Sequence, residues 1–155
     1  MEEILTSGPS AEDPDILPAA GMPPSDVIAE YSPLALAFLG DAVYELEVRG
    51  HIVRQGNSTP KKLTDKSSFF SRAHTQAILC DLILPDLSDE EADILRRGRN
   101  ANVNTVPKHA SHADYHKATS VEALFGYLYL TGRMDRVREL MQRVWSLFEG
   151  DNNGI

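Results

Sequence analysis

Two acidic residues interrupt apolar stretches of the sequence and are the first candidates for chemistry. Asp41 lies within PLALAFLGDAVYELEVR, at residues 33–49, and Glu122 lies within SVEALFG. A carboxylate that is buried without a partner is destabilising or takes up a proton, so each acid must have a cationic partner or face a polar cleft. If two helices bring these acids together, their oxygens suit Mg²⁺, which binds one or two carboxylates plus water and phosphate oxygens. The alternative interpretation is that each acid forms a structural ion pair.

A basic, asparagine-rich segment is the second candidate. Residues 96–117 hold five Lys and Arg residues against a single acid, Asp114. Cations contact phosphates, and asparagine side chains can bind ribose hydroxyls, so the segment fits RNA. The candidate RNA-binding residues are Arg96, Arg97, Arg99, Asn100, Asn102 and Lys108. A solvated helix end followed by an exposed loop is the alternative interpretation.

Other kinds of site have weaker support in the sequence. His109, His112 and His116 could ligate zinc, but no cysteine accompanies them, and surface histidines near RNA are the alternative. Cys80 lies in the apolar stretch AILCDLIL, which predicts a small buried residue and not a nucleophile. The sequence contains no Walker loop, GxGxxG or GxSxG motif.

The composition is that of one globular domain with an acidic front. The chain has 155 residues, 42% of them hydrophobic, and a net charge of −8. Residues 1–48 hold ten acids and no lysine or arginine, so the rest of the chain has all 15 basic residues against 13 acids. The overall sign therefore does not exclude a nucleic-acid partner. One cysteine, no membrane-length apolar run and no signal segment predict a cytoplasmic protein with no membrane contact.

Helices at predictable positions would hold these candidates. We expect a long helix from Ser32 to about Gln55, buried over most of its circumference, with Gly40 permitting a close approach of backbone or partner. Start signals and apolar spacing predict further helices at about 59–72, 71–84, 88–98, 112–130 and 134–148, with Trp145 at an edge or partner surface. No strand pattern occurs, so we predict an all-α domain of about six or seven helices.

The two ends of the chain differ from this helical middle. Residues 1–30 are predicted to be an acidic, proline-rich flexible tail in which Val27 and Ile28 could dock locally. Residues 31–149 would form the folded catalytic domain, and residues 150–155 a disordered C-terminal tail.

Three separated motifs resemble the ribonuclease III catalytic domain. They are LAFLGDAVYELEVR, RRGRNANVNTVPK and TSVEALFGYLYLTG, in that order, and the resemblance covers residues 31–149. The order and the middle motif are similar to the compact branch, Mini-ribonuclease III, which lacks a separate double-stranded-RNA-binding domain. Larger family members carry a glutamate where this chain has Ala37 and an aspartate where it has Thr119, and the compact branch is similar to this chain in lacking both.

The resemblance implies a ribonuclease III-like, Mg²⁺-dependent endonuclease that acts on double-stranded RNA as a homodimer. Asp41 and Glu122 would be its catalytic, metal-binding acids, and Phe38, Leu39 and Ala42 would lie in the dimer interface. Cleavage would leave 5′-phosphate and 3′-hydroxyl ends and would mature 23S (large-subunit) ribosomal RNA, with a large-subunit ribosomal protein as a candidate partner. Two other hypotheses stay open: a catalytically silent domain that binds structured RNA, and a helical scaffold that dimerises through its first long helix.

Overall fold

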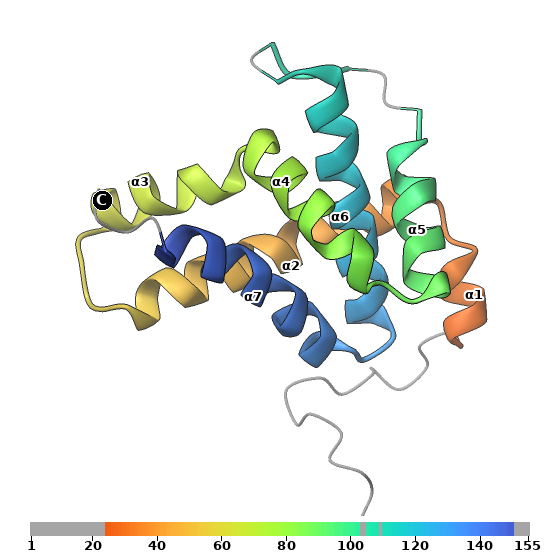
Figure 1. Cartoon of the computed structure of the whole chain (residues 1–155), viewed down its shortest axis with the longest axis horizontal. Helices are drawn as coiled ribbons and strands as arrows, with labels where there is room; N and C mark the ends of the chain where they lie inside the picture. The colour runs from red at the N-terminus through yellow and green to blue at the C-terminus, as the bar shows by residue number, and fades with distance from the viewer. Residues whose placement is uncertain (1–23, 103–104, 109, 151–155) are drawn as a thin grey trace, which may run out of the picture.

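The computed structural model describes residues 24–102, 105–108 and 110–150, and within them it contains helices and no strand (Figure 1). The elements are α1 Ser25–Ala29, α2 Pro33–Arg54, α3 Pro60–Ser71, α4 Ala73–Ile83, the short 3-10 helix η1 Leu84–Asp86, α5 Asp89–Arg99, α6 His112–Leu130 and α7 Met134–Gly150. This arrangement confirms the predicted all-α domain. None of the described helices is both long and apolar enough to cross a membrane.

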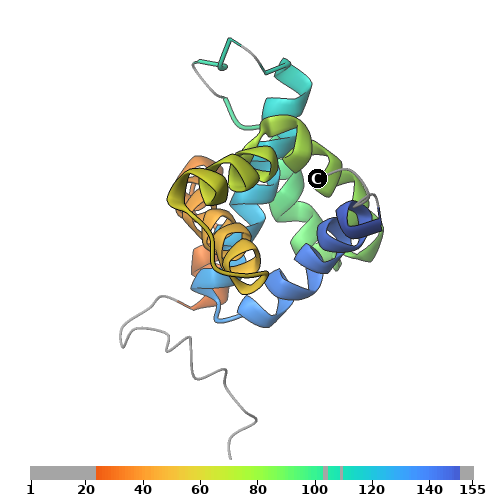
Figure 2. The same cartoon turned by 90° about the vertical axis from the view of Figure 1, so that its left-hand side faces the viewer.

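Helix α6 is the centre of the fold. It packs against α2, α5 and α4, and it also contacts α1 and α7 (Figures 1 and 2). Every residue from 118 to 128 is buried except Glu122. A helix that is covered on nearly all sides needs apolar or small residues around its whole circumference, which the sequence of α6 provides. Glu122 is therefore the one position in this stretch where the cover is open.

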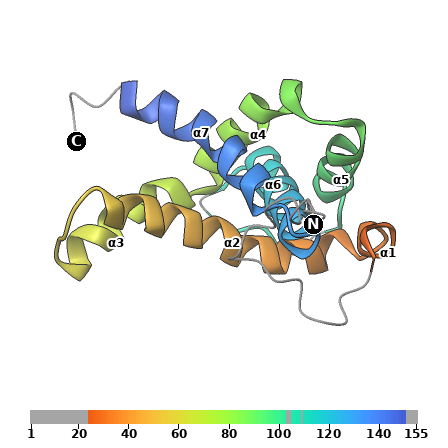
Figure 3. The ribbon, with the colours of Figure 1, turned by 90° about the horizontal axis from the view of Figure 1, so that it is seen from below.

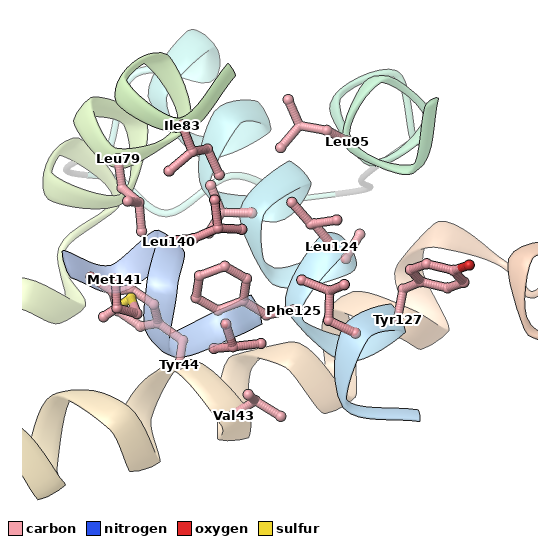
Figure 4. Packing of buried hydrophobic residues seen from close by; sticks show 14 of the residues in the cluster. Val43, Tyr44, Leu79, Ile83, Leu95, Leu124, Phe125, Tyr127, Leu140 and Met141 are labelled. Atoms are coloured by element: carbon pink, nitrogen blue, oxygen red, sulfur yellow. The ribbon is translucent and has the colours of Figure 1, made fainter. Parts of the chain in front are cut away.

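The main core lies between α6 and its neighbours. Figure 4 shows Phe125 of α6 pointing into a cluster with Tyr44 of α2 and Leu140 and Met141 of α7. The rings of Phe125 and Tyr44 lie 6.2 Å apart between centroids, and all four side chains are no more than 1% exposed. Burial of such large apolar side chains is the dominant stabilising term in a domain of this size.

Acids that face α7 are paired with its arginines. Glu91 of α5 is only 4% exposed, and Arg136 of α7 donates to it from Nε at 2.8 Å and from Nη2 at 3.0 Å. Glu47 of α2 is 8% exposed and forms an ion pair at 3.5 Å with Arg138 of α7. Burial would raise the pKa of Glu91, but the hydrogen bonds from Arg136 and Ser88 hold it below its usual value. These carboxylates are structural because each has a cation beside it.

The folded region begins earlier than the predicted boundary at residue 31. Ser25–Ala29 forms α1, and Ile28 is 1% exposed, which confirms that this residue docks on the domain. Arg97 of α5 holds the connection, because its guanidinium donates to the carbonyl oxygens of Ala29 and, at 3.3 Å, of Tyr31. The rest of the predicted tail, residues 1–23, and the C-terminal residues 151–155 lie outside the described residues.

Two expectations about side-chain exposure were wrong. Trp145 is 6% exposed, because its ring stacks on that of His51 at 3.9 Å between centroids and meets Phe70 edge-on. Helix α2 is not buried over most of its circumference, since Phe38 is 86% and Leu46 is 65% exposed. Its length carries it from α1 to α3 along one side of the molecule, and Figure 3 shows how much of that side has no helix over it.

Candidate active site at the crossing of α2 and α6

Helices α2 and α6 meet through two glycines that have no room for a side chain. A Cβ atom on Gly40 would overlap the backbone carbonyl oxygen of Glu122 and lie 2.8 Å from the backbone nitrogen of Gly126. A Cβ atom on Gly126 would likewise overlap the carbonyl oxygen of Leu36. The prediction that Gly40 permits a close approach of backbone is therefore confirmed. The two helices touch backbone to backbone, which fixes their relative position closely.

This contact brings the two predicted acids together. Asp41 follows Gly40 directly, and the backbone of Glu122 is the group against which Gly40 packs. The pKa of Glu122 is raised to about 7, chiefly by burial and then by the negative charges of Asp41 and Glu45, against a hydrogen bond from Gln76 that lowers it. Burial and the charge of Glu45 also raise the pKa of Asp41. The charge of Asp41 thus acts on Glu122 although 81 positions separate the two residues in the sequence.

No described cation pairs with either of the two acids. Among the residues that the structure describes, neither Asp41 nor Glu122 forms an ion pair, so the structural ion-pair interpretation finds no partner for them. Two adjacent carboxylates without a cation are a donor set that attracts a hard divalent ion. The described residues contain no group of three or more histidine, cysteine, aspartate or glutamate side chains able to hold a metal. The protein would therefore supply two ligands and leave the others to water and substrate.

Glu45 is a residue of this site that sequence reasoning missed. It lies one helical turn after Asp41, and the hydroxyl of Ser71 donates to its carboxylate. Arg49 also contacts Glu45 at 3.3 Å, as expected for a Glu–Arg pair four residues apart on one helix. That spacing alone suggests an ordinary surface ion pair, so it gives no sign that the charge of Glu45 also acts on Asp41 and Glu122. The signal that could have found it is the same four-residue spacing from Asp41, which puts both acids on one helix face.

A pocket opens beside Glu122. Its volume is about 430 Å³, and its walls come from the start of α4, the first half of α6 and the loop between α5 and α6. Glu122, Asp114 and Tyr115 line it from α6, and Arg72 and His74 line it from the corner between α3 and α4. The partly buried carboxylate of Glu122 therefore faces a space large enough for part of a bound molecule.

The predicted RNA-binding residues do not form one uniform surface. Arg96 is exposed and pairs with Asp93 at 2.6 Å, whereas Arg97 is half-buried and holds α1 in place. Asn100 is the C-cap of α5. The remaining candidates are exposed: Arg99, Asn102 and Lys108. Of the six, Arg97 thus has a structural task, and the others remain available to a partner.

The predicted interface residues lie on the open side of α2. Phe38 is 86% exposed, Ala42 is exposed and Leu39 is half-buried. Leu34 and Leu46, one turn before Phe38 and two turns after it, are 40% and 65% exposed. An exposed apolar stripe of this size on one helix is typical of an interaction surface.

The two positions where the larger family members carry further acids are occupied here by buried residues without a carboxylate. Ala37 is 6% and Thr119 is 5% exposed, and the hydroxyl of Thr119 donates to the carbonyl oxygen of Tyr115 in its own helix. Neither residue adds a carboxylate to the site.

The sulfur of Cys80 is buried, and burial raises the pKa of its thiol, as predicted for a packing residue. Of the three candidate zinc histidines, His109 lies outside the described residues.

Sequence and structure comparisons point to the same family. The family model described as Ribonuclease III domain matches residues 34–133, which include α2, α6 and both acids. A protein from Brevibacillus brevis named Mini-ribonuclease 3 is 40% identical over 121 residues, which is 78% of this chain and 90% of that protein. A Mini-ribonuclease 3 from Thermoanaerobacter is 44% identical over 74% of this chain and 81% of its own. A crystal structure of a Fusobacterium nucleatum protein matches with a TM-score of 0.69 and 33% identity, over 74% of this chain and 88% of that one.

Proposed function

The chain belongs to the ribonuclease III family and is an endoribonuclease, and from this premise we propose that the crossing of α2 and α6 is its active site. Asp41 and Glu122 are the proposed catalytic acids, and Mg²⁺ is the proposed metal. One observation carries the proposal: at a fixed backbone contact, the pKa values of Asp41 and Glu122 are both raised, and no cation among the described residues pairs with either acid. Members of this family generally depend on a divalent metal ion, and Mg²⁺ suits an all-oxygen donor set.

The proposed reaction is hydrolysis of a phosphodiester in double-stranded RNA. Water adds across the bond between phosphorus and the 3′ oxygen, so the hydroxyl goes to the 5′-phosphate product and a proton goes to the 3′ oxygen. When bound, the metal ion supplies positive charge that lowers the pKa of water and neutralises charge on the phosphate. Asp41 and Glu122 would hold it, and the glycine contact between α2 and α6 fixes the backbones that carry the two carboxylates.

A homodimer is the proposed form of the enzyme. The exposed stripe on α2 contains Phe38 with Leu39 and Ala42 beside it, and it lies on the same helix as Asp41. Two copies joined through this stripe would have two active sites related by a two-fold axis, one for each strand of a duplex. Phe38→Glu would place a charge in the apolar contact and is expected to give monomers in analytical ultracentrifugation. A dimer that persists in this variant would contradict the proposed interface.

The substrate is proposed to be a stem of the 23S ribosomal RNA precursor in the cytoplasm. The exposed basic residues Arg96, Arg99 and Lys108, with Asn100 and Asn102, support RNA contact on the side of the loop between α5 and α6. A large-subunit ribosomal protein bound to the same RNA is a proposed partner. Comparing cleavage of the precursor stem with cleavage of an unrelated duplex, with and without that protein, tests both parts.

Cleavage by acid variants tests the active-site proposal. The wild-type protein should cut a double-stranded RNA in Mg²⁺ and lose activity in EDTA. Asp41→Asn and Glu122→Gln keep nearly the same shape, and we expect each to slow cleavage by about a thousandfold or more. Glu139→Gln, which changes an exposed acid of α7, is the matched control and should cut at the wild-type rate. Full activity of Asp41→Asn would reject the assignment.

A further inference from the structure

We infer that Arg72 contacts a phosphodiester of the strand being cut, next to the bond that is hydrolysed, and so positions that strand over Glu122. This inference rests on the proposed function and adds a residue that lies outside the three motifs of the family resemblance. Arg72 lies between α3 and α4, a part of the chain for which the sequence predicts no functional role.

The first support is location. Arg72 and Glu122 line the same pocket of about 430 Å³, Arg72 from the corner between α3 and α4 and Glu122 from α6. RNA that places a phosphate beside Glu122 would extend into the space in front of this carboxylate, where the pocket opens. Consecutive phosphates on one strand are several ångströms apart, so a cation across the pocket from Glu122 meets a neighbouring phosphate.

The second support is charge. Arg72 is exposed, and no residue that the structure describes forms an ion pair or hydrogen bond with its guanidinium. The other charged groups of the pocket wall are two acids and a histidine: Glu122 itself and Asp114, whose Oδ2 lies 3.0 Å from Nδ1 of His74. The only free cation of the pocket wall, among described residues, is therefore Arg72. A guanidinium can bind a phosphate through two parallel hydrogen bonds, which fixes orientation as well as distance.

The third support is that the corner is held in place by the acid-bearing helix. The hydroxyl of Tyr44 donates to the carbonyl oxygen of Phe70 at 2.5 Å, and the hydroxyl of Ser71 donates to Glu45. Thr75 closes the corner from α4 by donating to the carbonyl oxygen of Phe69 at 2.7 Å. Tyr44 and Glu45 follow Asp41 by three and four residues, so α2 positions both the acid and the backbone that carries Arg72. A corner fixed in this way holds the backbone of Arg72 in place, so binding has only the arginine side chain left to order.

Substrates with single neutral linkages test the inference. A duplex with one cleavage site is made with a methylphosphonate at one linkage at a time on either side of that site, and single-turnover rates are measured with the full-length protein. Removing the negative charge at one linkage near the cut should slow cleavage by the wild-type protein by about 10- to 100-fold. Arg72→Ala should be slower by a similar factor on the natural duplex, with no further loss at that same linkage.

Two variants separate positioning from general charge. Arg72→Lys keeps the charge and should recover part of the rate, and circular dichroism melting checks that both Arg72 variants are folded. Arg54→Ala, which removes an exposed arginine at the end of α2, is the matched control and should keep the wild-type pattern of methylphosphonate effects. Arg72→Ala that cuts at the wild-type rate, or that keeps every methylphosphonate effect, would overturn the inference while leaving the proposed function intact. A wild-type protein that does not cut the natural duplex would instead overturn the proposed function, and this inference with it.

Discussion

Two parts of the molecule hold acids against packed helices, and they treat the charge in opposite ways. Along α7, Glu91 and Glu47 are buried beside Arg136 and Arg138, and hydrogen bonds hold the pKa of Glu91 below its usual value despite burial. At the crossing of α2 and α6, Asp41 and Glu122 have one another and Glu45 as neighbours, and both pKa values are raised.

The difference separates structural acids from functional ones. A buried ion pair needs both partners, and the loss of either leaves an uncompensated charge. An acid pair without a cation is unfavourable for folding on its own, so it persists only where rigid packing enforces it and where a ligand can relieve it. The contact between Gly40 and Gly126 is that packing, and the proposed Mg²⁺ is that ligand.

The largest expected effect comes from filling the glycine contact. Gly126→Ala places a Cβ atom into the carbonyl of Leu36, which must push α2 and α6 apart, and we expect a loss of at least about 3 kcal/mol in the free energy of unfolding. Gly50→Ala in α2 is the matched control, because its Cβ would meet only the end of the Arg54 side chain at 3.5 Å. Helix propensity should make that control about 0.5–1 kcal/mol more stable. Urea unfolding measures both, and equal stabilities would show that the crossing is not tightly packed.

Removing a structural cation should cost stability and not chemistry. Arg136→Met leaves the carboxylate of Glu91 buried without its cation, and we expect a loss of about 3 kcal/mol by urea unfolding. The cleavage rate per folded molecule should stay unchanged, since Arg136 pairs with Glu91 and Glu139 and not with Asp41 or Glu122. A large loss of rate in folded Arg136→Met would erase the distinction between the two regions.

Neutralising a functional acid should raise the stability of the metal-free protein, which is the reverse of removing a structural cation. The folded-state pKa of Glu122 is raised from 4.5 to about 7, so the folded protein holds more protons than the unfolded chain between these values, and metal-free stability falls as pH rises through this window. Glu122→Gln removes that loss and should be on the order of 2 kcal/mol more stable than wild type at pH 8, with little difference at pH 4. Thermal unfolding in EDTA at both pH values measures this, and a variant less stable than wild type at pH 8 would contradict it.

The smallest effect extends the comparison to cations. Arg97 donates to two backbone carbonyls near α1, so Arg97→Ala should lower stability by about 1 kcal/mol and leave RNA affinity nearly unchanged. Arg99 is exposed and has no ion pair among described residues, so Arg99→Ala should weaken RNA binding and leave stability unchanged. Melting curves and filter binding at fixed salt separate the two, and the opposite outcome would exchange their roles.

The helices could be predicted closely because their signals are local. At the predicted start near 88, Ser88 and Glu91 form a capping box with bonds of 3.2 and 2.9 Å, and at the predicted start near 59 the hydroxyl of Thr59 accepts from the backbone of Lys62. Asp41 and Glu122 could be selected as candidate site residues because an acid within an apolar run is unusual whatever the fold.

What the sequence did not show depends on contacts between distant segments. Trp145 was expected at an edge, but His51 and Phe70 arrive from two other helices to cover it. The sequence predicted no role for Glu45 or Arg72, whereas in the structure Ser71 contacts Glu45 and Arg72 lines the pocket beside Glu122. Apolar spacing predicted that α2 is buried over most of its circumference and did not indicate the exposure of Phe38 and Leu46.

The carboxyl resonance of Glu122 gives the most direct test of the central claim, that the acids at the crossing are unpaired and await a divalent cation. Its pKa can be followed by ¹³C NMR as pH is varied, with the resonance assigned by its absence in Glu122→Gln. Without metal we expect a pKa of about 7, and with saturating Mg²⁺ a fall of more than two units, because the cation replaces the repulsion from Asp41 by attraction. A metal-free pKa near 4.5, or a value that Mg²⁺ does not change, would contradict this account of the site.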